Sequence, residues 1–219
     1  MIEKVYVWLD ERMGLKGLYD TILDRKIPKV NWWFTLGSAS LIIFTIQGVT
    51  GMMLSVYYIP SPEFAYDSIQ YIMNGATFGW LIRGIHHWGS SMMVVLVFIH
   101  MLRTFFMASY KYPREMTWLT GVFLLLFTVA SSFTGYLLPW HQQAYWATVV
   151  GSELMGTIPV IGSFLSNVMR GGYDVSGVTL ARFFSVHALW LPALLAAVIG
   201  VHLYLVIRHG ISNIPGEQD

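Results

Sequence analysis

The sequence predicts an all-α integral membrane protein, a bundle of four transmembrane helices. Of its 219 residues, 55% are hydrophobic and only 11% are charged, which is typical of a membrane protein rather than a soluble domain. Four long stretches lack Asp, Glu, Lys and Arg altogether. The chain has no cysteine, which excludes disulfides, thiolate metal sites and thioether-linked cofactors.

The first 26 residues mix charged residues with Val, Tyr, Trp and Leu, unlike the apolar core of a signal peptide. This composition favours an interfacial amphipathic segment over residues 1–30. The net charge of +1 gives no indication of a nucleic-acid partner.

Each charge-free stretch is long enough for one span, since a transmembrane helix needs about 20 apolar residues. The stretches are 30–62, 84–102, 116–152 and 183–207. The helices predicted from them are 33–57, 80–106, 116–138 and 180–207.

The connections complete a single membrane domain over residues 1–219. Residues 57–79 form a Pro-containing link, and residues 107–115 form a short basic one. Residues 139–179 are long for a connection and rich in Trp and Tyr, so we expect surface helices within them.

The basic residues predict the orientation. With both termini on one side, ten basic residues lie on that side and three on the other, so the termini should face the cytoplasmic or stromal side. We call this the negative side and the opposite one the positive side. The ten are Lys4, Arg12, Lys16, Arg25, Lys26, Lys29, Arg103, Lys111, Arg114 and Arg208, and the three are Arg83, Arg170 and Arg182.

Four histidines lie inside the predicted spans. His86 and His100 are fourteen residues apart on the second helix, and His187 and His202 are fifteen apart on the fourth. In an α-helix these spacings return to within about 40° and about 60° of the same face, with about 21 Å between the two depths. The two helices run in the same direction, so His86 shares a depth with His187, and His100 with His202. Two facing imidazole pairs at two depths match two stacked six-coordinate b-type haems.

A single membrane histidine more often makes a helix–helix hydrogen bond or lines a polar path. Four glycines strengthen the haem interpretation, because glycine lets a backbone approach a flat macrocycle. Gly37 and Gly51 on the first helix, and Gly121 and Gly135 on the third, are again fourteen residues apart. Their antiparallel course puts Gly37 and Gly121 at the depth of His100, and Gly51 and Gly135 at the depth of His86.

The chain resembles the b6-type cytochromes of the cytochrome b6f/bc family over nearly its whole length. The resemblance rests on the histidine spacing and on six motifs: FGWLIRGIHHW (78–88), YPREMTWLTG (112–121), FTGYLLPW (133–140), IPVIGS (158–163), LARFFSVH (180–187) and IRHGIS (207–212). It implies that His86 and His187 ligate a positive-side haem, and that His100 and His202 ligate a negative-side haem.

The resemblance also implies contacts around these haems. Arg83 would pair with a propionate of the first haem, and Arg103 and Arg114 with the second haem or its surroundings. Gln47 would contact the edge of a haem, and Arg208 would lie at the rim of a negative-side quinone site. Ordinary anchoring of basic side chains at helix ends is the alternative for the arginines.

The resemblance further implies a quinol oxidation pocket on the positive side, with one wall formed by Tyr136, Leu138, Pro139 and Trp140. The other wall would come from a separate subunit that supplies the C-terminal half of cytochrome b, similar to subunit IV. Further expected partners are a Rieske iron–sulfur protein, a c-type cytochrome or equivalent, quinol and quinone, and a second copy of the complex. The expected membrane is a bacterial inner membrane or a thylakoid.

Three positions depart from the family pattern. Thr35 stands where b6-type chains have the cysteine that links a third haem, so a third haem is possible here only without a thioether bond. His141 replaces or adjoins an acidic residue, and would either carry protons from the quinol pocket or simply be exposed. His87 stands where chloroplast relatives have arginine, and it should not ligate the same haem as His86 because it points about 100° away. Apart from these three departures, His209 lies at the negative surface and should not be a haem ligand.

The function that these features predict is electron transfer across the membrane in a quinol-oxidising complex, coupled to proton translocation in a Q cycle. Two alternatives remain at this stage. One is a di-haem anchor of a hydrogenase or formate dehydrogenase type of enzyme, against which the long aromatic connection argues. The other is a haem-free transporter subunit, against which the matched glycines argue.

Overall fold

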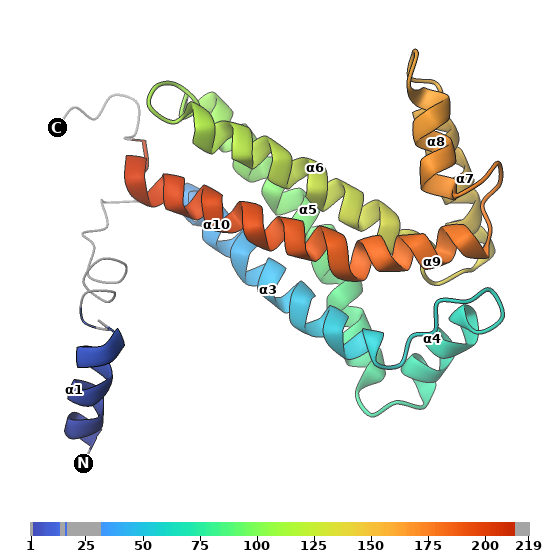
Figure 1. Cartoon of the computed structure of the whole chain (residues 1–219), viewed down its shortest axis with the longest axis horizontal. Helices are drawn as coiled ribbons and strands as arrows, with labels where there is room; N and C mark the ends of the chain where they lie inside the picture. Colours follow the sequence, from blue (N-terminus) through green and yellow to red (C-terminus); the bar gives the residue numbers. More distant parts are fainter. Residues whose placement is uncertain (1, 14–15, 17–31, 213–219) are drawn as a thin grey trace. The chain divides into compact units, whose positions relative to one another are not determined.

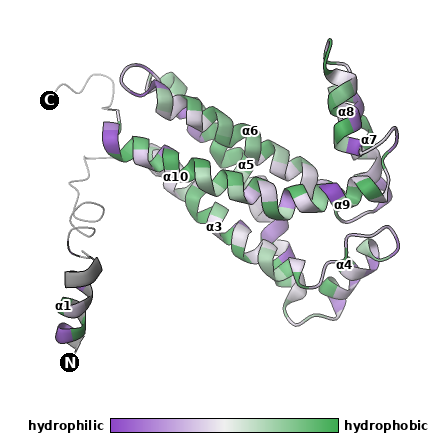
Figure 2. Cartoon of the chain, viewed as in Figure 1, coloured by the Kyte–Doolittle hydropathy of each residue, from purple (hydrophilic) through white to green (hydrophobic). Residues whose placement is uncertain are grey.

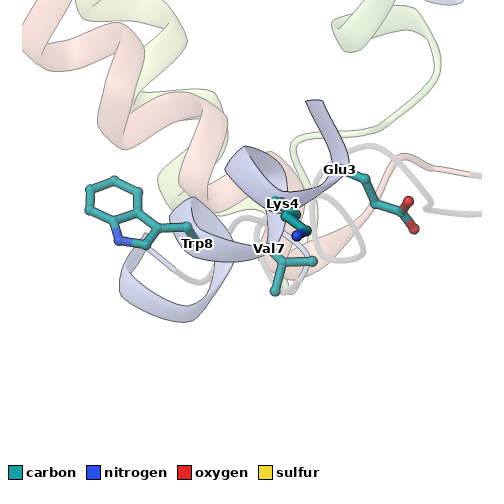
Figure 3. A pocket seen from close by; sticks show the side chains of 4 residues that line it. All are labelled: Glu3, Lys4, Val7 and Trp8. Carbon is teal, nitrogen blue, oxygen red and sulfur yellow. The ribbon is translucent and has the colours of Figure 1, made fainter. Parts of the chain in front are cut away.

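The computed structural model describes residues 2–13, 16 and 32–212, and it divides into two compact units, Met1–Thr35 and Leu36–Asp219. The first unit contains the helix α1 (Ile2–Met13) and the 3₁₀ turn η1 (Trp32–Thr35). Val7 and Trp8 are about half exposed on α1, where they line a shallow hollow with Glu3 and Lys4 (Figure 3). Such mixed side chains fit the interfacial helix predicted for this region. Residues 1, 14, 15 and 17–30 of the predicted interfacial segment lie outside the described part.

Four long helical segments form the second unit and lie side by side (Figure 1). Three of them are the uninterrupted helices α3 (Leu36–Ser55), α5 (Gly79–Phe106) and α6 (Glu115–Leu137). The fourth consists of α9 (Gly177–Ser185), the π-helical turn η2 (Val186–Trp190) and α10 (Leu191–His209). All four are long and apolar enough to cross a membrane, and all regular elements of the described residues are helical.

These segments lie where the sequence predicts the spans, with ends that differ by up to three residues. Hydrophobic residues predominate along these segments (Figure 2). Large side chains such as Phe98, Leu126 and Val201 remain about half exposed. Exposed apolar side chains along helices of this length are suited to lipid rather than water. The four-helix membrane architecture is therefore confirmed.

The fourth segment departs from the continuous α-helix that the sequence predicts over 180–207. The amide of Leu191 donates to the carbonyl of Val186, five residues earlier, and His187 lies inside this π turn. A π turn takes in one residue more than an α turn. The fifteen residues from His187 to His202 therefore rotate the chain about as far as fourteen residues of α-helix. The expected offset of about 60° is reduced to about 40°, which equals the offset of His86 and His100.

The long connections carry three shorter helices: α4 (Ala65–Asn74), α7 (Gln142–Gly156) and α8 (Gly162–Arg170). The last two lie within 139–179, and their expected place on the membrane surface remains a prediction. The main buried apolar cluster lies where these connections meet the ends of α6 and α9, rather than midway along the spans. Its members are Tyr58, Ala65, Ile72, Leu137, Val175, Leu180 and Phe183. This cluster fixes the end of α6 from which the FTGYLLPW motif emerges.

Tyr58 ties the link after α3 to the end of α6. Its ring is 9% exposed and packs on Phe184, and its hydroxyl donates to the carbonyl of Leu138 at 2.7 Å. Burial raises the pKa of Tyr58, so the phenol stays protonated and remains a donor.

Tyr58→Phe should lower the stability of the complex by about 1 kcal/mol, because it leaves the Leu138 carbonyl without this donor. The measurement is the Tm of the purified complex in detergent. Tyr57→Phe is the control, since Tyr57 is 48% exposed. Equal Tm values for the two variants would contradict the proposed role of this hydrogen bond.

Arg114, directly before α6, joins the two helix ends at the opposite end of the bundle. Its guanidinium donates to the carbonyls of Gly210 and Ile211 at 3.1 and 3.2 Å, and to that of His209 at 3.5 Å. These carbonyls follow the last turn of α10, where a cation is favoured by the helix dipole. Arg114 therefore anchors the end of α10, and its implied role beside a haem remains a prediction.

Candidate haem-binding site

His86 on α5 and His187 in the π turn face one another across the bundle. Their ring centroids are 6.2 Å apart and the ring planes make an angle of 83°. With a metal–imidazole bond of about 2 Å, two imidazoles on opposite sides of one metal have centroids about 6 Å apart. The separation of this pair therefore fits bis-imidazole ligation of a single metal.

His100 and His202 form the second pair, one toward the end of α5 and the other toward the end of α10. Both imidazoles are half-buried, and they lie close enough to interact. The fourteen-residue interval on α5 and the π turn before α10 bring the second pair onto the same inward faces as the first. The spans thus hold paired imidazoles at two depths.

Each of the four glycines lies against one of these histidines. A Cβ built on Gly37 or Gly51 comes within 3.2 Å of Cε1 of His100 or His86, respectively. A Cβ built on Gly121 lies 3.5 Å from Cε1 of His202, and one built on Gly135 lies 2.5 Å from Cε1 of His187. The structure places each glycine at the depth of the histidine that the sequence assigns to it. An added Cβ would crowd the imidazole at Gly37, Gly51 and above all Gly135, and would make an ordinary contact at Gly121.

Gly135→Ala should reduce haem binding between His86 and His187, because the new Cβ would come within 2.5 Å of the His187 ring and force that ring to move. Gly121→Ala should keep haem binding between His100 and His202 unchanged, since 3.5 Å is an ordinary contact. The haem content per chain of the purified complex should therefore differ between the Gly135→Ala and Gly121→Ala variants. Gly200→Ala is the control, because its Cβ would meet nothing within 4 Å. Equal haem contents in Gly135→Ala and Gly200→Ala would contradict this packing argument.

Three of the four histidines have a hydrogen-bond partner at Nδ1. The partners are the hydroxyl of Thr50 for His86, the hydroxyl of Thr120 for His202, and the carbonyl of Ser131 for His187, each at 2.9 Å. A histidine that donates from Nδ1 keeps the lone pair of Nε2 for a metal. The donor set and the glycine cradle therefore both fit a b-type haem at each level.

The two threonines are functional candidates that the sequence reasoning missed. Thr50 directly precedes Gly51 and Thr120 directly precedes Gly121. Thr134 precedes Gly135 in the same way. The repeated Thr-Gly dipeptide on glycine-bearing helices was the signal that could have identified them. Thr134 itself bonds back to the carbonyls of Ala130 and Ser131.

The other residues expected around the haems have distinct surroundings. Arg83 is half-buried one turn before His86, and its Nη1 lies 3.5 Å from Sδ of Met73. Gln47 lies against Gly89, and its Nε2 is one of the buried side-chain atoms of the described residues that have no hydrogen-bond partner. Arg103 is half-buried one turn after His100, and Arg208 is exposed with Nη1 3.2 Å from the hydroxyl of Tyr204. Their expected roles toward haem or quinone remain predictions.

The expected quinol-pocket wall begins at the last turn of α6. Tyr136 is 44% exposed, Leu138 and Pro139 are half-buried, and Trp140 packs edge-on against Tyr145 at 5.8 Å. The backbone of Trp140 is left-handed, with φ of 49°. A bulky residue adopts this conformation only where its surroundings impose it, and such residues concentrate at functional sites.

The structure shows that His141 is not simply exposed, and its role as a proton carrier remains a prediction. It is half-buried, and its Nδ1 accepts a hydrogen bond from the amide of Ala144 at 3.1 Å, which caps the N-terminus of α7. Capping is a common task of the acidic residues found at such positions. His87 is exposed against Trp88, with ring centroids 5.6 Å apart, and Thr35 donates to the carbonyl of Trp32 at 2.7 Å.

The fold and the paired imidazoles together define a membrane-embedded electron-transport protein that binds b-type haem. The family model for cytochrome b/b6/petB matches residues 22–210. The chain is 42% identical to the cytochrome b6 of Acaryochloris marina and to that of Synechococcus elongatus, in each case over 97% of this chain and 99% of the relative. The chain belongs to the cytochrome b/b6 family.

A solved structure agrees with this assignment. The chain superposes on a chain of a hyperthermophilic respiratory complex III with a TM-score of 0.87 and 35% identity, over 97% of its own length. It spans 58% of that solved chain. The protein is therefore a subunit of a multi-subunit bc-type oxidoreductase complex.

Proposed function

We propose that this chain is the di-haem subunit of a quinol-oxidising cytochrome b6f/bc-type complex. The 6.2 Å separation of the His86 and His187 rings is the observation that carries the proposal. Two b-type haems would supply a one-electron relay between a positive-side quinol oxidation site and a negative-side quinone site, coupled to proton translocation in a Q cycle. The other proposed members of the complex are a subunit like subunit IV, a Rieske iron–sulfur protein and a c-type cytochrome or equivalent, in a dimeric assembly.

The residues of the chain divide this task. His86 and His187 hold the positive-side group, and His100 and His202 hold the negative-side group. Because each iron would have two protein ligands, no coordination position stays open for substrate, which suits electron transfer rather than bond making. The four glycines keep side chains away from the imidazoles, and Tyr136 to Trp140 line the quinol pocket. Both termini would face the cytoplasmic or stromal side of a bacterial inner membrane or thylakoid.

The direction of transfer imposes an energetic condition. An electron that moves from the His86–His187 level to the His100–His202 level travels toward the negative side, against the field. Moving one charge across the whole membrane costs about 2.3 kcal/mol per 100 mV. The negative-side pair must therefore hold its haem at the higher reduction potential, which proteins achieve through ligand hydrogen bonding, burial and nearby charge.

An oxidant-pulse experiment tests the proposal. The purified complex is incubated with a short-chain quinol and then mixed rapidly with ferricyanide, while the α-band of the b-type haem is followed. When the two electrons of quinol take separate routes, the oxidant removes the first and the second enters the haems. The pulse should therefore increase haem reduction transiently. A monotonic oxidation of the haem would contradict the Q-cycle role and favour a simple di-haem anchor.

A further inference from the structure

The hydroxyls of Thr50 and Thr120 each lie between a histidine Nδ1 and a backbone carbonyl of their own helix. Thr50 Oγ1 donates its hydrogen to the carbonyl of Ile46 at 2.7 Å, and Thr120 Oγ1 donates to that of Met116 or Thr117 at 3.0 and 2.9 Å. A hydroxyl carries one hydrogen, so toward the imidazole each can act only as an acceptor. If Nε2 of His86 and His202 binds a haem iron, the ring proton lies on Nδ1, which then donates to these hydroxyls.

His187 reaches the same state by another partner. Its Nδ1 lies 2.9 Å from the Ser131 carbonyl, which has no hydrogen to give. Three of the four imidazoles thus donate from Nδ1 to an oxygen on the neighbouring helix. His100 differs, because its Nδ1 is buried and has no hydrogen-bond partner among the described residues.

The sequence explains this difference at one position. Leu36 precedes Gly37, whereas a threonine precedes each of the other three inward glycines. The local geometry is otherwise the same: a Cβ on Gly37 lies 3.2 Å from Cε1 and 3.8 Å from Nδ1 of His100, and a Cβ on Gly51 lies 3.2 and 3.8 Å from the same atoms of His86. A threonine at position 36 would hold the same place before Gly37 that Thr50 holds before Gly51.

We propose that this asymmetry helps to set the order of the two haem potentials. Thr50 and Thr120 act as positioning residues that fix the tautomer of their histidines, and Leu36 leaves His100 without such an acceptor. A hydrogen bond from Nδ1 makes an imidazole a more basic ligand, which stabilises the ferric state and lowers the reduction potential. The positive-side pair has two such hydrogen bonds and the negative-side pair has one. The His100–His202 level should consequently have the higher potential.

The inference rests on the proposed function, since it assumes that the four histidines are haem ligands. It assigns the cause of the potential order to Nδ1 hydrogen bonding rather than to the fold as a whole. The charge of Arg103 also acts on His100. Because Arg103 is retained in all the variants tested, its contribution to the reduction potential of the His100–His202 haem does not change between them.

The test is a redox titration of the purified complex carrying Leu36→Thr, with Leu36→Val as the matched control that has the same shape without the hydroxyl. Leu36→Thr should lower the midpoint potential of the His100–His202 haem relative to Leu36→Val and leave the other haem unchanged. The low-spin EPR signal of the same haem should shift with it. In the opposite direction, Thr50→Val should raise the midpoint of the His86–His187 haem, and Thr50→Ser should restore it.

The outcomes separate two kinds of failure. Two haems per chain with equal midpoints in Leu36→Thr and Leu36→Val would overturn this inference and leave the proposed function intact. A similar shift of both haems in Leu36→Thr would also overturn it, because the effect would then be global. Fewer than two haems in the unmodified complex would instead overturn the proposed function.

Discussion

Replacing His86 with alanine should remove one b-type haem from the complex, and replacing His187 should remove the same one. The two rings lie 6.2 Å apart at a single depth, so either change leaves the iron with one protein ligand in an apolar bundle. His100→Ala and His202→Ala should each remove the other haem for the same reason. Each variant should therefore retain about half of the haem of the unmodified complex. Redox titration identifies the haem that remains by its midpoint potential.

Three histidines outside the two pairs provide matched controls. His87 is exposed, His141 caps α7, and the backbone of His209 is held by Arg114. Alanine at each of these positions should keep both haems. If His86→Ala and His187→Ala removed different haems, the pairing by depth would be wrong.

Deleting Ala188 should leave both haems in place, although it shortens a membrane-spanning segment between two ligands. Ala188 lies in the π turn, which contains one residue more than an α turn. The deletion converts the interval from His187 to His202 into fourteen residues of regular helix. That interval keeps both imidazoles within about 40° of one face, as on α5. Haem content per chain and the two midpoint potentials are the measurements.

The same deletion on α5 should fail. Val94 lies between His86 and His100 in a regular helix, so its loss turns one histidine by about 100° relative to the other. The complex carrying this deletion should lose at least one haem. Haem loss from the Ala188 deletion together with retention in the Val94 deletion would refute the compensating role of the π turn.

The sequence predicts the spans and the paired histidines well because both depend on local pattern. Long charge-free stretches locate the four membrane helices, and the fourteen-residue intervals on three helices follow directly from α-helical geometry. The π turn at His187 was not predictable in this way. The composition of VHALW (186–190) does not distinguish a π turn from an α turn. The extra residue is recognised only from the structure, where the fifteen residues from His187 to His202 turn the chain about as far as fourteen residues of α-helix.

Side-chain partners were harder to predict than positions. The cap that His141 provides to α7 was not predicted, because it depends on the backbone that brings the amide of Ala144 to Nδ1. Arg114 was expected beside a haem, yet it bonds to the carbonyls that follow α10, nearly one hundred residues later in the chain. Such contacts depend on how helix ends meet in three dimensions. The Thr-Gly dipeptides are the exception, since they were present in the sequence and acquire meaning once the glycines are known to face the histidines.

The most direct test of the di-haem account is a dithionite-reduced minus oxidised spectrum of the purified complex, with haem counted per copy of this chain after acid–acetone extraction. The account predicts two extractable b-type haems. A third extractable haem would show that a further haem is bound without a thioether, as the threonine at position 35 requires. One haem, or none, would contradict the assignment of the two histidine pairs.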